Sequence, residues 1–285
     1  MLAIAAALGA ALAWGISAGC DNRSTRLIGS LQALAWVQLI GLAQVLPFAV
    51  YEGTPSMPST HALAWIVVGG VGVCVGLTLA YAAIGRGAVS VVSPVMAVDG
   101  ALAALASVAL GEHIAIATAG GLVLVIAGML VVLYATASQE RAGVAGHSLA
   151  AVLLAVGAAC GFSLFLLAAI RAGDAVGDAW LQLIYRVLPF LVVGVPLLWR
   201  RQLGLPGKAW AYVAAAAALQ TAGFVLYRVA GRSGGVAIPS VLSSQFAVIA
   251  IVGGVLILGE RLSRRQVGGL AGLLAGVAVI AGTHA

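Results

Sequence analysis

The sequence predicts an all-α membrane protein in which ten transmembrane helices form two inverted repeats of five helices each. The composition, the spacing of the apolar stretches and an internal duplication lead to this prediction. Of the 285 residues, 63% are hydrophobic and 8% are charged, and the mean hydropathy is +1.15. A soluble domain carries about a quarter charged residues, and intrinsic disorder requires low hydrophobicity. Both classes are therefore excluded.

Ten apolar stretches have the length of a transmembrane helix. About 20 apolar residues cross about 30 Å of hydrocarbon, where every backbone amide needs an internal partner. The first stretch lacks a basic leader, so we interpret it as a retained helix rather than a cleaved signal peptide. We expect helices at 2–20, 27–51, 62–84, 88–110, 115–135, 148–170, 176–199, 209–228, 236–258 and 265–283.

Motifs from the first half of the chain recur in the same order in the second half. Trp36-Val37-Gln38-Leu39-Ile40 is matched by Trp180-Leu181-Gln182-Leu183-Ile184, and Gly111-Glu112 is matched by Gly259-Glu260. We therefore expect a first five-helix repeat at 1–138, a connecting loop at 139–147 and a second repeat at 148–285. Because five is odd, the second repeat enters the membrane inverted, an architecture that recurs in transporters.

Most basic residues lie in alternate connections between the predicted helices. The even-numbered connections contain only Arg171, Arg228 and Arg232. The odd-numbered ones contain Arg23, Arg26, Arg86, Arg141, Arg200, Arg201, Lys208, Arg261, Arg264 and Arg265. The positive-inside rule places the odd connections in the cytoplasm and both termini outside, in an inner or plasma membrane. No basic run lies beside stacking aromatics, so the lipid bilayer rather than nucleic acid is the expected partner of this basic chain.

Several motifs resemble the drug/metabolite transporter superfamily, in particular proteins built from two EamA-type repeats. The resemblance rests on Ala13-Trp14-Gly15, on Gly-Arg-Gly-Ala-Val-Ser-Val-Val-Ser-Pro at 85–94 and on Gly259-Glu260-Arg261-Leu262-Ser263. It extends over nearly the whole chain and implies a central cavity, lined by the first, third, fourth, sixth, eighth and ninth helices, that opens alternately to each side. It leaves the solute open among amino acids, metabolites, nucleotide-linked sugars and drugs. It also implies that both termini face the cytoplasm, so the orientation stays open.

Two charged residues fall deep inside predicted helices. Asp99 lies at the middle of 88–110, where a carboxylate costs about 3 kcal/mol to insert unless it faces a cavity or a partner. One hypothesis is that Asp99 binds a proton or a cationic group and couples it to transport; the alternative is a packing hydrogen bond to a neighbouring helix. Arg186, in 176–199, has three interpretations: an ion pair with Asp99, contact with a substrate carboxylate or phosphate, or snorkelling to an interface.

Further polar and aromatic side chains are candidates for the wall of a substrate site. Gln245, flanked by Ser243 and Ser244, occupies the ninth stretch at nearly the position of Asp99 in the fourth. The alternatives are interhelical hydrogen bonds for the polar side chains and interface anchoring for the aromatic ones. The predicted substrate-binding residues are Trp14, Ser17, Tyr81, Asp99, Ser163, Arg186, Tyr227, Ser244 and Gln245.

Prolines and glutamates punctuate corresponding places in the two halves. Pro94 and Pro239 interrupt the fourth and ninth stretches, where each removes an amide donor. They predict a hinge or an exposed carbonyl near the site, with a tolerated kink as the alternative. Glu112 and Glu260 lie at turns, so we expect capping rather than catalysis. Arg228, near a predicted helix end, is expected at the membrane interface.

No catalytic, metal or cofactor motif is present. The three cysteines form no CxxC pair, the four histidines lie in predicted loops or the tail, and no HExxH or GxxxxGK[ST] occurs. We therefore expect no enzyme, no metal and no cofactor. The sequence predicts a secondary transporter that exports a small organic metabolite or drug, with proton coupling as the leading mechanism. The alternatives are a facilitator or importer of the same fold, or a membrane scaffold or sensor without flux; monomer and homodimer both stay open.

Overall fold

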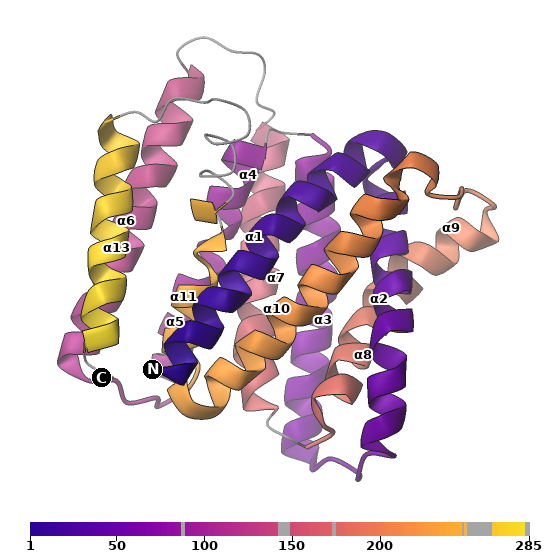
Figure 1. The fold of residues 1–285 in the computed structure, drawn as a ribbon, viewed down its shortest axis with the longest axis horizontal. Helices are drawn as coiled ribbons and strands as arrows, with labels where there is room; N and C mark the ends of the chain where they lie inside the picture. Colours follow the sequence, from indigo (N-terminus) through magenta and orange to yellow (C-terminus); the bar gives the residue numbers. More distant parts are fainter. Residues whose placement is uncertain (87–88, 142–148, 173–174, 247, 250–263, 283–285) are drawn as a thin grey trace.

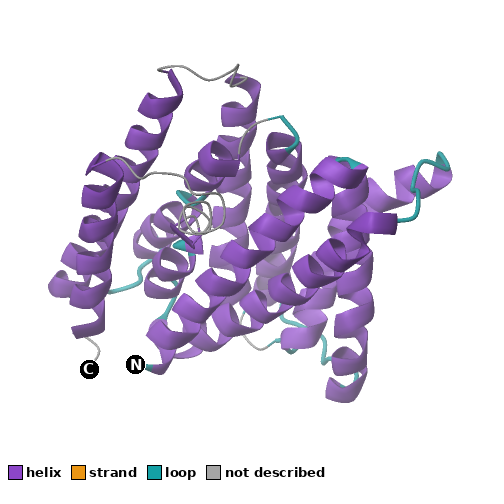
Figure 2. Cartoon of the chain, turned by 45° about the horizontal axis from the view of Figure 1, so that its top comes forward, coloured by secondary structure: helices purple, strands orange, loops and turns teal. Residues whose placement is uncertain are grey.

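Every regular element in the described part of the computed structural model is a helix (Figures 1 and 2). The description covers residues 1–285 except 87–88, 142–148, 173–174, 247, 250–263 and 283–285. The first half contains α1 (Leu2–Ile28), α2 (Ser30–Glu52), α3 (Thr60–Ile84), α4 (Val89–Met96), α5 (Asp99–Ala109) and α6 (Ile116–Arg141). The second half contains α7 (Leu149–Arg171), α8 (Asp178–Pro189), η1 (Phe190–Gly194), α9 (Val195–Trp199), η2 (Gly207–Ala209), α10 (Trp210–Gly234), α11 (Ala237–Ser243) and α13 (Arg264–Gly282).

Six helices among the described residues are long and apolar enough to cross a membrane. They are Leu2–Ile28, Ser30–Glu52, Thr60–Ile84, Ala150–Arg171, Asp178–Trp199 and Gly207–Ser233. Shorter apolar helices lie at Asp99–Ala109, Ile116–Gly128 and Val267–Ile280. The prediction of an all-helical chain with several membrane-length apolar helices is therefore confirmed, but its ten continuous spans are not.

The predicted stretches 88–110 and 176–199 are not uninterrupted α-helices. The fourth stretch divides into α4 and α5, with a turn at Ala97 and Val98 between them. In the seventh, Pro189 is followed by the π-helical turn η1, consistent with the backbone donor that proline removes. In the ninth, α11 ends at Ser243 and a turn follows at Ser244 and Gln245. Most of the rest of that stretch lies outside the described residues.

The two halves contact each other in a reciprocal pattern. The first helix of each half packs along the third of the other, so α1 lies along α10 and α3 along α7. Two of the remaining helices pack on their own counterparts, α2 on α8 and α6 on α13, and α5 of the first half packs on α11 of the second. In Figure 1, α1, α3 and α6 run upward, whereas their counterparts α7, α10 and α13 run downward. Equivalent helices of the two halves therefore point in opposite directions.

Reciprocal side-chain contacts repeat this pattern. The indole of Trp36 in α2 donates to Gly204 O at 2.8 Å, and the matching Trp180 in α8 donates to Gly53 O at 2.6 Å. Each tryptophan thus bonds the loop that follows its counterpart helix in the other half. The matched motifs of the sequence therefore hold equivalent positions at opposite ends of the bundle.

Glycines permit the closest helix contacts. A Cβ on Gly72 of α3 would lie 2.7 Å from Gly161 O of α7, and a Cβ on Gly276 of α13 would lie 2.7 Å from Gly121 O of α6. Small residues are how helices approach each other in lipid, where no hydrophobic force drives them together. The glycine-rich motifs of both halves therefore set the spacing of the helices around the interior.

Candidate functional site

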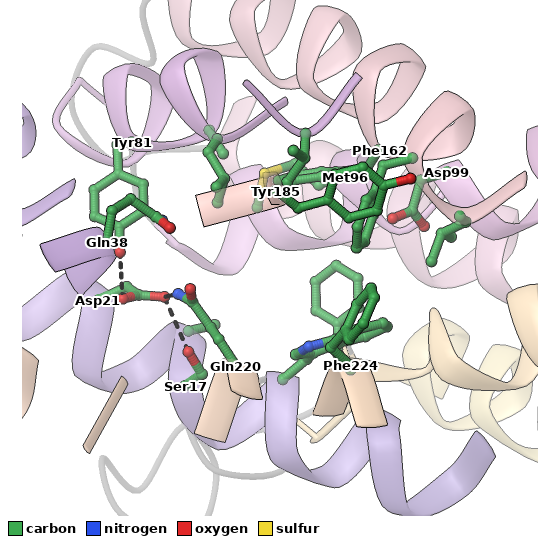
Figure 3. Close-up of a pocket in the computed structure, with 18 of the residues that line it drawn as sticks. Ser17, Asp21, Gln38, Tyr81, Met96, Asp99, Phe162, Tyr185, Gln220 and Phe224 are labelled. Carbon is green, nitrogen blue, oxygen red and sulfur yellow. Dashed lines mark hydrogen bonds between the residues drawn. The ribbon is translucent and has the colours of Figure 1, made fainter. Parts of the chain in front are cut away.

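A cavity of about 160 Å³ lies between the two halves of the bundle (Figure 3). Its wall comes from α1, α2, α3, α4 and α5 of the first half and from α7, α8 and α10 of the second, with Phe246 beyond α11. The second and seventh predicted helices thus contribute, in addition to those that the family resemblance implied. The lining residues are Trp14, Ser17, Ala18, Asp21, Gln38, Val73, Leu77, Ala80, Tyr81, Ile84, Met96, Asp99, Phe162, Phe165, Leu166, Gln182, Tyr185, Arg186, Gln220, Phe224 and Phe246.

A carboxylate held by three donors forms one end of the cavity. Asp21 Oδ1 accepts from Tyr81 Oη at 2.5 Å, and Oδ2 accepts from Ser17 Oγ and Gln220 Nε2, both at 3.1 Å. The predicted first helix ends at residue 20, which would place Asp21 in a loop. The structure continues α1 to Ile28, so Asp21 is buried inside the bundle.

A second carboxylate lies at the helix break on the opposite side of the cavity (Figure 3). Asp99 is the first residue of α5 rather than the middle of a continuous helix. Its Oδ1 accepts from Ser244 Oγ of the other half and from its neighbour Gly100 N, both at 2.6 Å. No described residue donates to Oδ2. The side chain therefore takes up an amide that the break leaves without an intrahelical acceptor, and it keeps one oxygen available.

Arg186 of α8 is buried in the cavity wall without a carboxylate partner. Its Nη2 donates to Ala217 O at 2.9 Å and to Thr221 Oγ1 at 2.8 Å. Its Nη1 reaches Val37 O and Gln38 Oε1 only at 3.5 Å, and its Nε has no acceptor. Among the described residues no ion pair joins it to Asp99 or Asp21. Of the three interpretations of Arg186, the ion pair with Asp99 and snorkelling to an interface are therefore wrong.

Aromatic rings separate the polar ends of the cavity. Phe165 and Phe224 stack with their centroids 5.9 Å apart, and Tyr185 meets both rings edge-on. Trp14 packs against Tyr227 with the ring centroids 5.8 Å apart. The cavity thus combines a ring-lined centre with charged groups at its walls, as small-molecule sites do.

The structure brings five of the nine predicted substrate-binding residues to the cavity: Trp14, Ser17, Tyr81, Asp99 and Arg186. The other four lie behind its wall. Tyr227 Oη is 2.8 Å from both Leu166 O and Ser240 Oγ, and Gln245 Nε2 donates to Val241 O at 2.8 Å. Ser244 does not line the cavity but bonds Asp99, which does. Ser163 is buried and is not among the lining residues. Pro239 lies in α11 and Pro94 falls in α4, each within a few residues of a break.

Sequence reasoning missed several polar residues of the cavity. Asp21, Gln38, Gln182 and Gln220 line it, and none of them was predicted. Two signals were available. Gln38 and Gln182 are the matching glutamines of the duplicated Trp-containing motif, and Ser17 lies four residues before Asp21, a spacing that places both on one helix face.

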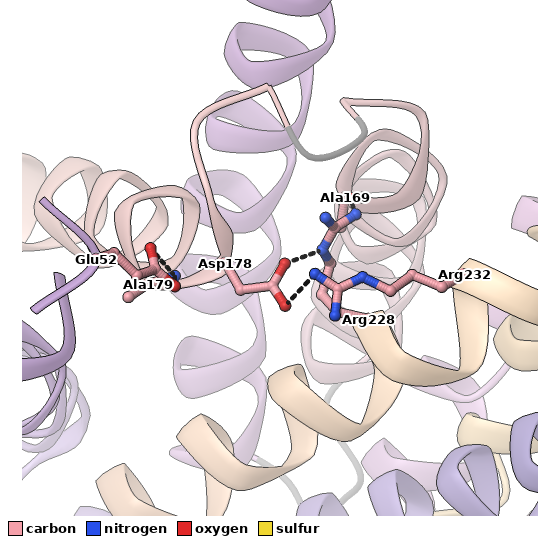
Figure 4. Close-up of polar contacts among 6 residues, drawn as sticks. All are labelled: Glu52, Ala169, Asp178, Ala179, Arg228 and Arg232. Carbon is pink, nitrogen blue, oxygen red and sulfur yellow. Dashed lines mark hydrogen bonds and ion pairs between the residues drawn. The ribbon is translucent and has the colours of Figure 1, made fainter. Parts of the chain in front are cut away.

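Two further predictions concern charges outside the cavity. Glu112 caps α11 of the other half, since its carboxylate accepts from Val236 N at 3.0 Å and Ala237 N at 3.1 Å. The capping prediction for Glu112 therefore agrees with the structure, while Glu260 lies outside the described residues. Arg228 is not interfacial. It is 2% exposed, bonds Asp178 Oδ1 at 2.8 Å and donates to Ala169 O at 2.6 Å, with Arg232 on the other carboxylate oxygen (Figure 4).

The donor set of the cavity does not suggest a metal site. No group of three His, Cys, Asp or Glu side chains that would hold a metal ion occurs among the described residues. Asp21 and Asp99 lie on opposite sides of the cavity in Figure 3. Its chemistry is that of two separate carboxylates, a guanidinium and neutral amides around aromatic rings.

Comparisons with known proteins relate both halves of the chain to one family. The profile of the EamA-like transporter family matches residues 1–134 and again 149–282. A crystal structure described only as "Crystal structure of protein" superposes with a TM-score of 0.76 at 21% identity, over 97% of this chain and 95% of the other. At that identity the likeness concerns the fold alone. The search of curated proteins gives no match.

Proposed function

Because the chain belongs to the EamA-like transporter family, we propose that it is a secondary transporter that exports a small organic solute by alternating access, with Asp99 as the proton carrier. Two inverted repeats of five spans would enclose the solute site at the middle of the membrane. The observation that carries the proposal is the position of Asp99. Its carboxylate lies at a helix break on the cavity wall and is bonded across the two halves to Ser244.

The Asp99–Ser244 contact suits a group that gains and loses a proton. Ser244 Oγ lies 2.6 Å from Asp99 Oδ1 and 2.8 Å from Ser240 O. When Asp99 is ionised, the single hydroxyl proton of Ser244 is directed to the carboxylate. When Asp99 is protonated, Ser244 can direct that proton to Ser240 O and accept from Asp99 instead. Both protonation states therefore keep the contact between the halves satisfied.

Solute flux driven by a pH gradient tests the proposal. Proteoliposomes receive a defined mixture of small organic acids, amines and neutral aromatic compounds, and mass spectrometry measures what accumulates with and without an imposed gradient. We expect at least one compound to accumulate only with the gradient. Asp99→Asn abolishes this dependence, whereas Glu140→Gln, at the end of α6, retains it. Equal flux without a gradient would indicate a facilitator, and no flux of any compound would indicate a scaffold or sensor.

The direction of export depends on the orientation in the membrane. We propose that the end of the bundle that carries Arg23, Arg200 and Arg201 faces the cytoplasm, because basic residues accumulate there. In a background without the three cysteines, an impermeant maleimide should label Ser56→Cys in intact cells and Gln202→Cys only after permeabilisation. The reverse pattern would place both termini in the cytoplasm.

A further inference from the structure

The strongest unexplained feature of the cavity is a buried guanidinium whose donors are incompletely used. Arg186 is 4% exposed, yet its Nε has no acceptor and its Nη1 has only contacts of 3.5 Å. Good N–H···O bonds measure about 2.7–3.2 Å. Its charge interacts with that of Asp21 only from beyond ion-pair distance. A buried charge without a carboxylate in contact is costly, so this residue needs an explanation beyond packing.

The neighbouring amide has the same deficit. Gln38 of α2 is 1% exposed, and its Oε1 faces Arg186, while its Nε2 has no partner. Both residues line the cavity. Buried donors without partners are rare in proteins and call for an explanation. Both atoms are enclosed in this conformation, so an acceptor from the cavity would reach them once the two side chains turn toward it. Two neighbouring cavity-lining side chains with unused donors favour such an acceptor as the missing partner.

The backbone of α2 lies against the Arg186 guanidinium at Gly41, where the absence of a side chain leaves room for it. A Cβ on Gly41 would collide with the guanidinium at Nη1, Cζ and Nε, so no larger side chain fits there without displacing it. The corresponding residue in the first half is Gln44, which is not on the cavity wall. The two halves therefore differ at this position, since only the second half carries a positive charge there, and this charge lies in a polar part of the cavity wall.

Asp21 does not supply the missing acceptor. It shares the cavity with Arg186, but its oxygens are outside ion-pair distance of the guanidinium and accept from Ser17, Tyr81 and Gln220. Three of about four acceptor positions of that carboxylate are thus filled by the protein itself. The incompletely bonded groups next to each other on this wall are donors, which favours an anion over a cation as the occupant.

We infer that Arg186 and Gln38 bind the anionic group of the solute, and that the solute is a compact carboxylic acid with an apolar, ring-sized body. This inference rests on the proposed function and assigns the substrate class. Guanidinium donors match the geometry of a carboxylate. The body would lie among Phe165, Tyr185 and Phe224. The volume of about 160 Å³ is close to the roughly 150 Å³ of a cavity that accepts benzene in another protein.

Binding of three probes of similar size tests the charge. Benzoate, benzamide and benzylamine are titrated into the purified full-length protein in nanodiscs at neutral pH. We expect benzoate to bind at least tenfold more tightly than benzamide, and benzylamine to bind most weakly. Equal or tighter binding of benzylamine would assign the site to a cation at Asp99 and overturn the inference. Absence of saturable binding by all three probes would also overturn it.

Variants connect the preference to the named side chains. Arg186→Gln should reduce the benzoate preference over benzamide to less than threefold, whereas the exposed Arg200→Gln should leave it unchanged. Gln38→Leu keeps the guanidinium and should weaken benzoate several-fold, so the inference remains testable if Arg186→Gln does not fold. A benzoate preference that survives both cavity substitutions would refute the assignment.

Flux separates this inference from the proposed function. Benzenesulfonate is permanently charged and does not leak through lipid, so its movement into proteoliposomes reports transport of an aromatic anion. Binding of benzoate through Arg186 without any solute flux would support the anion site and contradict the transporter. Gradient-driven flux of other solutes, without a preference for anions in binding, would support the transporter and overturn the anion site.

Discussion

Gly100→Ala tests how closely the two halves meet at the helix break. Gly100 is the second residue of α5, and a Cβ there would collide with Ser244 Oγ and with the Ser240 carbonyl oxygen of α11. The second contact is with backbone, so a side-chain rotation cannot relieve it. Either α5 and α11 separate, or Ser244 leaves Asp99.

The expected loss of stability follows from these two effects. Overfilling a packed interior costs about 1–3 kcal/mol, and losing a hydrogen bond to a charged group costs about 1.5–3 kcal/mol. Since one effect partly relieves the other, we expect Gly100→Ala to lower the free energy of unfolding by about 2–4 kcal/mol. Gly120 of α6 has no atom within 4 Å of its Cβ position. Gly120→Ala should therefore be neutral or stabilise by about 0.5–1 kcal/mol, because alanine favours a helix over glycine.

The measurement is reversible unfolding of both variants in mixed micelles titrated with denaturing detergent. The matched control removes the intrinsic effect of alanine in a helix, so the difference between the variants reports the contact alone. Unfolding free energies of the two variants within about 0.5 kcal/mol of each other would refute the close approach of α5 and α11, and with it the Asp99–Ser244 bond.

Three other contacts give separate predictions. Glu112→Gln removes the charge that caps α11 and should lower the unfolding free energy by about 1 kcal/mol; an unchanged value in the same titration would contradict the capping role. Asp178→Asn removes the negative charge to which Arg228 and Arg232 bond and should lower the unfolding free energy by about 2 kcal/mol. The measurement is the melting temperature of the variant, and a value equal to that of wild type would contradict a role for this charge. Trp180→Phe removes the bond to Gly53 O and should increase deuterium exchange in the loop after α2, whereas exchange identical to wild type would argue against a role for that bond.

Much of the helical framework could be predicted from the sequence, because hydrophobic length is a strong signal in a membrane protein. The same signal concealed the helix break before Asp99. An apolar run such as 88–110 satisfies the length rule whether or not it is continuous. What interrupts it is a side-chain acceptor, Asp99 Oδ1, which takes up the amide of Gly100. A hydropathy average over about 20 residues cannot reveal that one backbone amide bonds a side chain instead of a backbone carbonyl.

The polar residues of the cavity were harder to predict, because their environment depends on helices distant in sequence. Asp21 follows the predicted end of an apolar stretch and precedes Arg23, a context typical of a membrane surface. It is buried because Tyr81 and Gln220 approach it from α3 and α10. Arg228 was misassigned for the same reason, since Asp178 and the Ala169 carbonyl that bury it come from other elements. No local pattern contains these partners.

The duplication leads to a final prediction about where the carboxylate must lie. Asp99 and Ser244 follow Pro94 and Pro239 at the same spacing, so they hold equivalent places in the two halves, and they bond each other. Asp99→Ser combined with Ser244→Asp exchanges the partners and retains one carboxylate and one hydroxyl. Ser244→Asp alone places two carboxylates together, and Asp99→Ser alone leaves none. We therefore expect the double variant to lose less unfolding free energy than the two single variants lose together, with a coupling energy of about 1–3 kcal/mol. Additive effects would show that the contact contributes nothing specific. The double variant could be stable and yet lose the dependence of its flux on the pH gradient. In that case coupling requires the carboxylate at position 99, and a carboxylate at position 244 does not replace it.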